Sequence, residues 1–365
     1  MKKILLISNM YPSEKFKHYG VFVQNVENLL KENKFIVKKV VMTKQTNFVL
    51  KLIGYIIFHL KVIFRGLFGN YDYLYVHFVS HSSLGAVIVK KIKPGTKLIL
   101  NCHGNDVVAD TEKDFPNIKR SRKYLQYADK VVVPSNYFKK VLIDNYGILK
   151  DKIFVYPSGG VNTSLFINKD TAVAKKNSHL NSNYNYIGFI SRIEKDKGWD
   201  TFIYMIKELE KMELITKYNL RFLMVGIGDE EYLMNDIIKE LEVEKYIERR
   251  KMFSQDELVN IYNSLDLFIF PTSRKSDSLG LVGLEAMSTE TFTIATNGYG
   301  PSDYMQDGIN GLTFSKEDYK ELSSKVEMYY EMDTKEKEKI KKEGRKTAIL
   351  YDTLKTQYKI LEVFE

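Results

Sequence analysis

Short apolar runs alternate along this chain with stretches in which apolar residues recur every three to four positions, as in a helix. This alternation occurs in two series and limits the folds that the chain can adopt. The first series runs from residue 3 to residue 156, and the same order of patterns returns from residue 186. Strands that alternate with helices in this way pair in parallel and carry helices on both faces of the sheet. The sequence therefore predicts an α/β protein with two doubly wound parallel sheets.

The expected elements follow from apolar runs for strands and from an apolar repeat of three to four residues for helices. Strands are expected at 3–8, 35–42, 73–78, 97–101, 130–133 and 153–156, then at 186–191, 221–225, 267–270 and 292–296. Helices are expected at 21–30, 48–68, 84–91, 115–127 and 137–146, then at 199–212, 230–241, 255–264 and 281–288, with a charged helical tail from residue 316.

A polar stretch rich in Lys, Asn and Ser, residues 168–185, separates the two series. We interpret it as a linker because it shows little periodicity. The sequence thus predicts a first domain at 1–167, a linker at 168–185 and a second domain at 186–345. A final helix at 346–365 is expected to pack back on the first domain.

Cysteine usage and the N-terminus predict a cytoplasmic protein. Cys102 is the single cysteine among 365 residues, which excludes an internal disulfide and fits a reducing compartment. The first residues are basic and then apolar, as in a signal peptide, but the apolar run is short and leads into Tyr11-Pro12-Ser13 instead of a small-residue cleavage site. A first buried strand is the expected structure here.

The net charge of +9 is distributed unevenly along the chain. Residues 1–165 contain 26 Lys and Arg against 11 Asp and Glu, a net charge of +15, whereas the remaining residues contain 29 against 35, a net charge of −6. A basic half of this kind fits nucleic acid or an anionic membrane surface. Because no zinc-finger spacing or base-stacking motif is present, we expect no nucleic acid partner and favour the membrane.

The longest apolar stretch, residues 48–68, contains Lys51, His59, Lys61 and Arg65. Three cations inside the stretch argue against a membrane-spanning helix. At about 100° per residue, these four side chains share an arc of roughly 160° and the other positions are apolar. Such a helix packs on a sheet with its basic side in water, or lies in a membrane interface, and both can hold at different faces.

A candidate ligand site lies in the segment 276–287, which reads Ser-Asp-Ser-Leu-Gly-Leu-Val-Gly-Leu-Glu-Ala-Met. Gly280 precedes a short apolar helix, whose first backbone amides would favour a phosphate. Glu285 lies about one turn further on, where its carboxylate could accept both hydroxyls of a ribose. The alternative is an ordinary core helix in which Glu285 is simply a polar position.

Two cations follow the first strand of the second series. Arg192 and Lys197 lie five residues apart on a strand-to-helix turn, so both could reach an anion, although charged loops are usually only solvated. Together with Glu285 and Gly280 at the same edge of the predicted sheet, they describe a site for a nucleoside diphosphate. We expect no metal, because there is no Asp-x-Asp pair, and the two cations and the helix amides would neutralise the leaving group.

Other nucleotide motifs are weak or missing. Gly226 and Gly228 follow a strand, but Glu231 stands where the dinucleotide fingerprint has its third glycine, and there is no P-loop. In the first series, His103 follows a strand end and would project toward a ligand, or would serve as a structural hydrogen-bonding group. Gly20 would allow the backbone to approach a sugar or phosphate, or would be a simple turn glycine.

The order and spacing of these segments resemble the retaining glycosyltransferases of family 4. That family has the GT-B fold, in which two facing Rossmann-like domains form an interdomain cleft, and the similarity extends over nearly the whole chain. The segments that carry it are Tyr11-Pro12-Ser13 through Gly20-Val21-Phe22-Val23, His103-Gly104-Asn105-Asp106, Val155-Tyr156-Pro157-Ser158-Gly159-Gly160-Val161-Asn162 through Phe166, Ser191-Arg192 with Lys197-Gly198, Val225-Gly226-Ile227-Gly228, Gly280-Leu281-Val282-Gly283-Leu284-Glu285-Ala286-Met287, and Asp307-Gly308-Ile309-Asn310-Gly311.

The resemblance implies roles for particular residues. Arg192 and Lys197 would hold the donor diphosphate, Glu285 the ribose, and Asp277 with the loop to Gly280 the donor sugar. His103 would lie near that sugar. The catalytic candidates are His103, Arg192, Lys197 and Asp277, and the candidate donor-binding residues are Gly20, Gly226, Gly228, Asp277, Ser278, Leu279, Gly280, Leu281, Val282 and Glu285.

The resemblance also implies an activity: transfer of a hexose-type sugar from a UDP- or GDP-sugar to a glycan or lipid-linked acceptor, with retention and without a cofactor. We expect a role in cell-surface polysaccharide synthesis on the inner face of the plasma membrane. One departure concerns the Glu-x7-Glu motif of the family, which here reads Asp277-x7-Glu285 and has a shorter first acid. The alternative is a non-catalytic partner subunit with the same fold.

Overall fold

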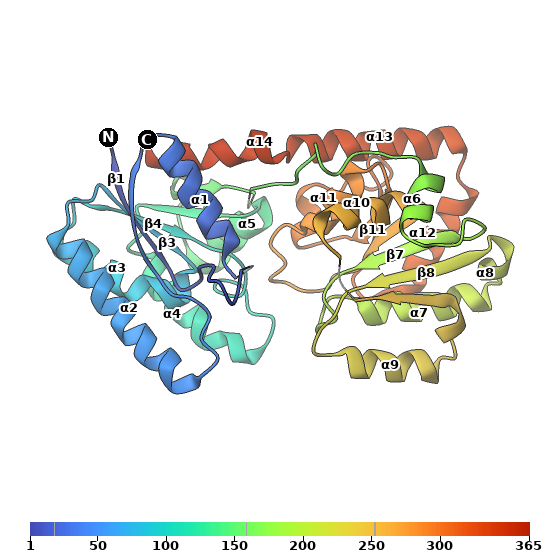
Figure 1. Cartoon of the computed structure of the whole chain (residues 1–365), viewed down its shortest axis with the longest axis horizontal. Coiled ribbons are helices and arrows are strands. Elements are labelled where there is room, and N and C mark those ends of the chain that lie inside the picture. Colours follow the sequence, from blue (N-terminus) through green and yellow to red (C-terminus); the bar gives the residue numbers. More distant parts are fainter. Residues whose placement is uncertain (18, 158, 252) are drawn as a thin grey trace. The chain divides into compact units, whose positions relative to one another are not determined.

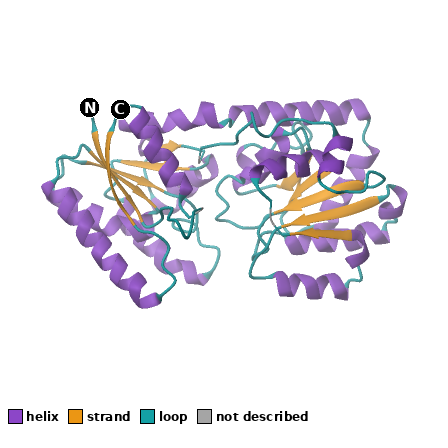
Figure 2. Cartoon of the chain, in the orientation of Figure 1, coloured by secondary structure: helices purple, strands orange, loops and turns teal. Residues whose placement is uncertain are grey.

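The computed structural model describes residues 1–17, 19–157, 159–251 and 253–365, so Ser158 of the sequence motif above lies outside the described residues. The chain forms two compact units (Figure 1). Unit 1 consists of Met1–Gly159 and Leu354–Glu365, and unit 2 consists of Gly160–Thr353. Each unit contains a six-stranded parallel sheet with helices on its faces (Figure 2), which confirms the predicted fold class of two doubly wound sheets.

The sheet of unit 1 has the strand order β2-β1-β3-β4-β5-β6. Ile7 of β1, the strand next to the edge, lies beside Val40 of β2 and Val76 of β3, and all pairings are parallel. The strands are β1 (Lys3–Ser8), β2 (Ile36–Val41), β3 (Tyr73–His77), β4 (Lys97–Asn101), β5 (Lys130–Val133) and β6 (Ile153–Val155). The α-helices are α1 (Val21–Glu32), α2 (Phe48–Phe68), α3 (Val79–Ile92), α4 (Phe115–Leu125) and α5 (Asn136–Tyr146).

Both faces of this sheet are buried, because alternate side chains of each strand enter different cores. Leu5 and Ile7 point into the core with α2 to α5, whereas Ile4 and Leu6 point into the core with α1. The second core is completed by the 3₁₀ segment Gln357–Phe364, which follows the short helix α14 (Thr353–Thr356). Phe364 packs edge-on against Tyr75 of β3 at 5.3 Å between ring centroids.

The sheet of unit 2 has the order β12-β11-β10-β7-β8-β9 and is also parallel. Its strands are β7 (Asn185–Ile190), β8 (Leu220–Val225), β9 (Ile247–Arg250), β10 (Leu267–Phe270), β11 (Phe292–Thr296) and β12 (Leu312–Phe314). Its α-helices are α6 (Thr171–Asn177), α7 (Trp199–Lys211), α8 (Leu214–Lys217), α9 (Glu231–Glu240), α10 (Gln255–Ser264), α11 (Leu281–Ser288), α12 (Tyr319–Glu331) and α13 (Thr334–Leu350). Two apolar cores cover the two faces of this sheet.

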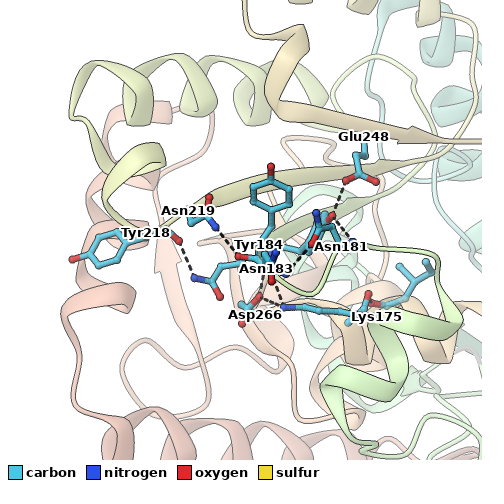
Figure 3. Close-up of polar contacts among 12 residues, drawn as sticks. Lys175, Asn181, Asn183, Tyr184, Tyr218, Asn219, Glu248 and Asp266 are labelled. Atoms are coloured by element: carbon cyan, nitrogen blue, oxygen red, sulfur yellow. Dashed lines mark hydrogen bonds and ion pairs between the residues drawn. The ribbon is translucent and has the colours of Figure 1, made fainter.

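The stretch expected to be a linker, 168–185, is part of unit 2 and contains helix α6. Figure 3 shows how it is attached: the buried Lys175 donates to the carbonyl of Tyr184 at 2.9 Å and pairs with Asp266 at 3.4 Å. Asp266 in turn accepts from the backbone of Tyr186 at 2.8 Å. Polar side chains here make specific contacts that composition does not reveal. The unit boundaries at residues 159 and 354 therefore differ from those expected at 167 and 346.

Helix α2 has the expected bounds, but only a narrow seam of it is buried. Phe58, Val62 and Gly66 are buried, whereas Leu60 is 61% exposed and Phe64 is 64% exposed. Phe58 and Val62 pack in the core on the sheet of unit 1, and Lys51, Lys61 and Arg65 are exposed, as expected for a helix packed on a sheet with its basic side in water. Most of the apolar surface of α2 is nevertheless left exposed. Among the described residues, no helix is long and apolar enough to cross a membrane.

The buried seam of α2 packs closely on α3 because glycines stand at the contact. A Cβ on Gly66 would lie 2.6 Å from Cγ2 of Val89, a fully buried side chain of α3. A Cβ on Gly85 of α3 would lie 3.0 Å from the carbonyl oxygen of His59 in α2. Because glycine has no side chain, the axes of α2 and α3 can approach closely at these two positions.

We expect Gly66→Ala to lower the free energy of unfolding by about 1–3 kcal/mol relative to Gly54→Ala, since the added methyl group overpacks the α2–α3 contact. Both glycines lie inside α2, so the gain in helix propensity is the same for both variants. A Cβ at Gly54 would meet only the mobile end of Met42, at 3.3 Å. Urea unfolding of the two variants measures the difference, and equal midpoints would contradict the described packing.

Candidate functional site

The carboxyl ends of the strands of unit 2 lie at one edge of the sheet, because all six strands run parallel. The loops after β7 and β10, two neighbouring strands, are tied together there: the amide of Ser273 donates to the carbonyl of Asp196 at 3.0 Å. Gly198 starts α7 with φ 78°, and a Cβ there would lie 2.0 Å from the carbonyl oxygen of Pro271. Close backbone contact thus brings the two loops side by side.

Lys197 and Asp277, one from each loop, form a largely buried ion pair. Their side chains are 11% and 12% exposed, and the Lys197 ammonium donates to Oδ1 of Asp277. The other oxygen, Oδ2, accepts from the hydroxyl of the buried Thr272 at 2.6 Å. Burial lowers the pKa of Lys197, and the charge of Asp277 opposes that shift. The pair fixes a cation and a carboxylate at the edge of the sheet.

Arg192 stands at the same edge in a more open position. Its side chain is 62% exposed, and its guanidinium donates to Glu194 at 2.5 Å. Glu194 uses its second oxygen to accept from Arg274 at 2.9 Å, so that it lies between two guanidinium groups. Carboxylates therefore pair with Arg192, Arg274 and Lys197, and this is where an anionic ligand would compete for the cations.

Helix α11 begins at this edge directly after Gly280, which has φ 79°. A Cβ on Gly280 would lie 2.4 Å from the ring of Phe270, so both the left-handed backbone and the space require glycine. The hydroxyl of Tyr304 donates to the carbonyl of Gly280 at 2.9 Å and holds the turn. The amides of Leu281 and Val282 then form the first turn, where a helix has no internal acceptors.

Other residues of this loop differ in burial. Ser278, Leu281 and Val282 are half-buried, whereas the side chain of Leu279 is buried in the apolar core. Leu279 could therefore act on a ligand only through its backbone.

Glu285 lies one turn into α11 and is half-buried. Burial raises the pKa of its carboxyl group, and a hydrogen bond from Tyr262 lowers it. The Tyr262 hydroxyl donates to Oε2 at 2.9 Å and orients the carboxylate. Tyr262 itself is fully buried in α10. Oε1 of Glu285 is the oxygen with which it would accept from a ligand hydroxyl.

Gly226 and Gly228 have a structural reason to be glycine. A Cβ on Gly226, where φ is 145°, would lie 1.8 Å from the carbonyl oxygen of Ser191, and a Cβ on Gly228 would lie 2.1 Å from that of Ile193. The loop after β8 therefore runs against the backbone on either side of Arg192. These glycines position the cation-bearing loop, and a direct contact with a ligand is not needed to explain them.

The candidates of unit 1 lie at the carboxyl edge of its own sheet. The Nε2 atom of His103 lies 3.0 Å from Nδ1 of His77, and Phe22 packs on His103 at 4.6 Å between ring centroids. Burial lowers the pKa of His103 to about 3 and that of His77 well below its usual value, so both imidazoles are neutral at physiological pH. The backbone amides of His103 and Gly104 donate to Asp106 and fix the turn.

Gly20 starts α1 with φ 80°, and a Cβ there would lie 2.6 Å from the carbonyl carbon of Met10. The glycine thus brings the N-terminus of α1 against the loop after β1.

The structure joins some of the predicted site residues directly and provides partners that the sequence did not reveal. Lys197 contacts Asp277, and Gly280 and Glu285 share one helix. The partners that sequence reasoning missed are His77, Glu194, Tyr262, Thr272, Arg274 and Tyr304. Thr272 and Arg274 follow a strand end, a position that could have pointed to them, whereas Tyr262 looks like any buried aromatic of a helix.

No group of three or more His, Cys, Asp or Glu side chains that could hold a metal ion occurs in the parts of the chain that the structure describes.

Family models of glycosyltransferases match both units of the chain. A model of glycosyltransferase family 4 matches residues 18–164, and a model of glycosyl transferases group 1 matches residues 170–347. The chain is 26% identical over 249 residues to the capsular polysaccharide biosynthesis glycosyltransferase CapM of Staphylococcus aureus. That match covers 63% of this chain and 61% of CapM, so the chain spans less than two thirds of this relative.

Two solved structures share the fold over the whole chain. A glycosyltransferase from Rickettsia africae has a TM-score of 0.74 at 20% identity and covers 100% of this chain and 97% of its own. Anabaena HepE in complex with UDP and glucose has a TM-score of 0.74 at 17% identity, with 100% and 99% covered.

We expect Tyr262→Phe to raise the pKa of Glu285 further, because the hydroxyl stabilises the charged carboxylate by hydrogen bonding. Tyr304→Phe is the matched control, since its hydroxyl donates to Gly280 instead. Titration of ¹³C-labelled Glu carboxyl groups by NMR, with Glu285→Gln to assign the signal, measures both. A Glu285 pKa that is unchanged by Tyr262→Phe would contradict the described hydrogen bond.

Proposed function

Because this chain belongs to glycosyltransferase family 4 and has the GT-B fold, we propose that it is a retaining glycosyltransferase that uses a UDP- or GDP-sugar of hexose type. The acceptor is a glycan or a lipid-linked glycan in cell-surface polysaccharide synthesis. One observation carries the proposal: cations, helix amides and a half-buried carboxylate stand at a single edge of unit 2. The UDP and glucose bound to Anabaena HepE and the name of CapM support it.

In this proposal, Arg192 and Lys197 bind the diphosphate of the donor. The exposed guanidinium of Arg192 offers a planar fork, and Lys197 offers a point charge. The amides at the start of α11 add partial positive charge from the helix dipole. These groups stabilise the negative charge that grows on the diphosphate as the bond to the sugar breaks, which is the main contribution to the rate.

Glu285 accepts from the ribose hydroxyls through Oε1, while Tyr262 keeps its other oxygen in place. Asp277 and the loop through Ser278, Leu279 and Gly280 bind the donor sugar. Because Thr272 and Lys197 hold both oxygens of Asp277, its carboxylate is preorganised toward a sugar hydroxyl.

In unit 1, the proposal assigns substrate binding to His103 and Gly20 at the carboxyl edge of its own sheet. A neutral His103 hydrogen-bonds a sugar hydroxyl without adding charge. Retention follows from attack of the acceptor on the face from which the diphosphate leaves, and the departing phosphate takes the proton of the acceptor hydroxyl. No metal or other cofactor takes part in the proposed reaction. The enzyme works on the cytoplasmic side of the plasma membrane, bound to its surface.

Turnover of nucleotide sugars tests the proposed activity. A panel of radiolabelled UDP- and GDP-hexoses is incubated with the protein, and release of the sugar to water or to added glycan acceptors is measured with and without EDTA. We expect turnover of at least one donor, unchanged by EDTA. Nucleotide binding without turnover of any donor would favour the alternative of a non-catalytic partner subunit, and inhibition by EDTA would contradict metal independence.

The role of Glu285 is tested by UDP binding. We expect Glu285→Gln to weaken the binding of UDP by about tenfold to hundredfold, since hydrogen bonds to a charged group are lost. Isothermal titration calorimetry measures this affinity. Glu240→Gln, an exposed position on α9, is the control and should bind like the unaltered protein. Equal affinities of all three proteins would remove the ribose assignment.

A further inference from the structure

An apolar surface runs along α2. We define the α2 face as the exposed side chains of Leu52, Ile53, Ile56, Ile57, Leu60 and Phe64. At about 3.6 residues per turn these positions recur on one side of the helix. A contiguous stripe of exposed Leu, Ile and Phe differs from the scattered apolar residues of an ordinary surface and marks a place of contact with another apolar body.

The α2 face points away from unit 1. The residues that hold the helix in place, Phe58, Val62 and Gly66, form the seam against α3 and lie on the opposite side of the helix. Figure 1 shows α2 alongside α3 in unit 1. Further exposed apolar residues continue the surface at both ends of the helix, Phe48 at the start and Phe68 at the end.

The charges on α2 are all positive. Lys51, Lys61 and Arg65 are exposed, and the helix contains no Asp or Glu. Lys61 and Arg65 flank the apolar stripe, and the Arg65 guanidinium donates to the carbonyl of Lys39 at 2.6 Å. The first 165 residues carry a net charge of +15, from 26 Lys and Arg against 11 Asp and Glu. An apolar stripe bordered by cations is typical of a helix that lies in the interface of an anionic membrane.

We propose that the α2 face inserts into an anionic membrane leaflet, parallel to its plane, with Lys61 and Arg65 at the level of the lipid headgroups. This inference rests on the proposed function for the presence of a membrane-bound acceptor. It adds the surface that binds the membrane and the way in which that surface binds. Apolar burial provides most of the affinity, and the cations provide the preference for anionic lipid.

This mode of binding also orients unit 1. The hydroxyl of Tyr55, in the first half of α2, accepts from the side chain of Asn9 at 3.0 Å. Asn9 follows the end of β1, so the first half of α2 lies beside the carboxyl edge of the unit 1 sheet. A membrane that holds α2 therefore lies close to the edge that carries His103 and Gly20. A lipid-linked acceptor would reach this edge without leaving the leaflet.

Vesicle flotation tests the proposal with the full-length chain. The vesicles contain phosphatidylcholine and phosphatidylglycerol in equal parts, or phosphatidylcholine alone. We expect Leu60→Ser with Phe64→Ser to weaken binding about tenfold or more at every salt concentration, because two large apolar side chains no longer insert. Lys61→Glu with Arg65→Glu should abolish only the preference for phosphatidylglycerol. Leu149→Ser, an exposed apolar position elsewhere in unit 1, is the control and should bind normally.

A second readout uses the near-native substitution Phe64→Trp. In vesicles with brominated acyl chains we expect its fluorescence to be quenched, whereas Leu149→Trp should not be quenched. Because Phe64→Trp keeps an aromatic ring at the position, it tests insertion even where the double serine variant does not fold. Unchanged flotation of the serine variant, or no quenching of Phe64→Trp, would overturn the proposal.

A second copy of the chain is the competing occupant of the α2 face. Analytical ultracentrifugation shows whether the unaltered chain forms a dimer. If it does, if Leu60→Ser with Phe64→Ser dissociates this dimer, and if the unaltered chain does not bind vesicles, the α2 face is a dimer contact and the proposal is overturned. UDP binding is measured on the same samples. Vesicle binding without UDP binding would contradict the proposed function and support this inference. UDP binding without vesicle binding would contradict this inference alone.

Discussion

Parallel pairing of the strands determines most of what this molecule can do. The inner strands of a parallel sheet are buried on both faces, so they are rich in apolar residues and need helices above and below. The same pairing brings the loops that follow the strands to one edge. In unit 2, this edge collects Arg192, Lys197, Asp277 and the start of α11 from segments nearly ninety residues apart in the chain.

Charge burial at this edge has an energetic cost that the structure offsets locally. Burial lowers the pKa of Lys197, and the negative charge of Asp277 opposes that shift and favours the charged ammonium. Thr272 satisfies the second oxygen of Asp277, so no buried polar atom of the pair lacks a hydrogen bond. The result is a cation and a carboxylate that each have a partner at the carboxyl edge of the unit 2 sheet.

Much of the fold could be predicted from the sequence, because buried parallel strands are continuous apolar runs. The bounds of β4, β5, β10 and β11 agree with the expected ones. Strand β9 was not expected because its residues, Ile-Glu-Arg-Arg, form a polar edge of the sheet, and β12 has only three residues. Helix α6 was taken for linker because its attachment depends on single polar contacts such as those of Lys175.

The expected strand ends were enough to predict which site residues share an edge of the sheet. They were not enough to predict the side chains with which those residues form hydrogen bonds and ion pairs. Tyr262 carries no signal that separates it from other core aromatics, and the pairing of Lys197 with Asp277 depends on loop geometry. For α2, the helical projection gave the side chains that share a face. It could not give the side of the helix that faces the protein, because that side is determined by the close packing of α2 on α3, which Gly66 and Gly85 allow.

The end of the chain has a consequence for biosynthesis. Unit 1 is discontinuous: Phe364 fills its core next to Tyr75, although nearly two hundred residues of unit 2 separate this segment from the rest of the unit. A ribosome releases Phe364 only after unit 2 has been made, so during translation the sheet of unit 1 lacks part of its cover. Unit 2 is therefore the first domain able to complete its core, and unit 1 can complete its core only after the segment that contains Phe364 has also been synthesised.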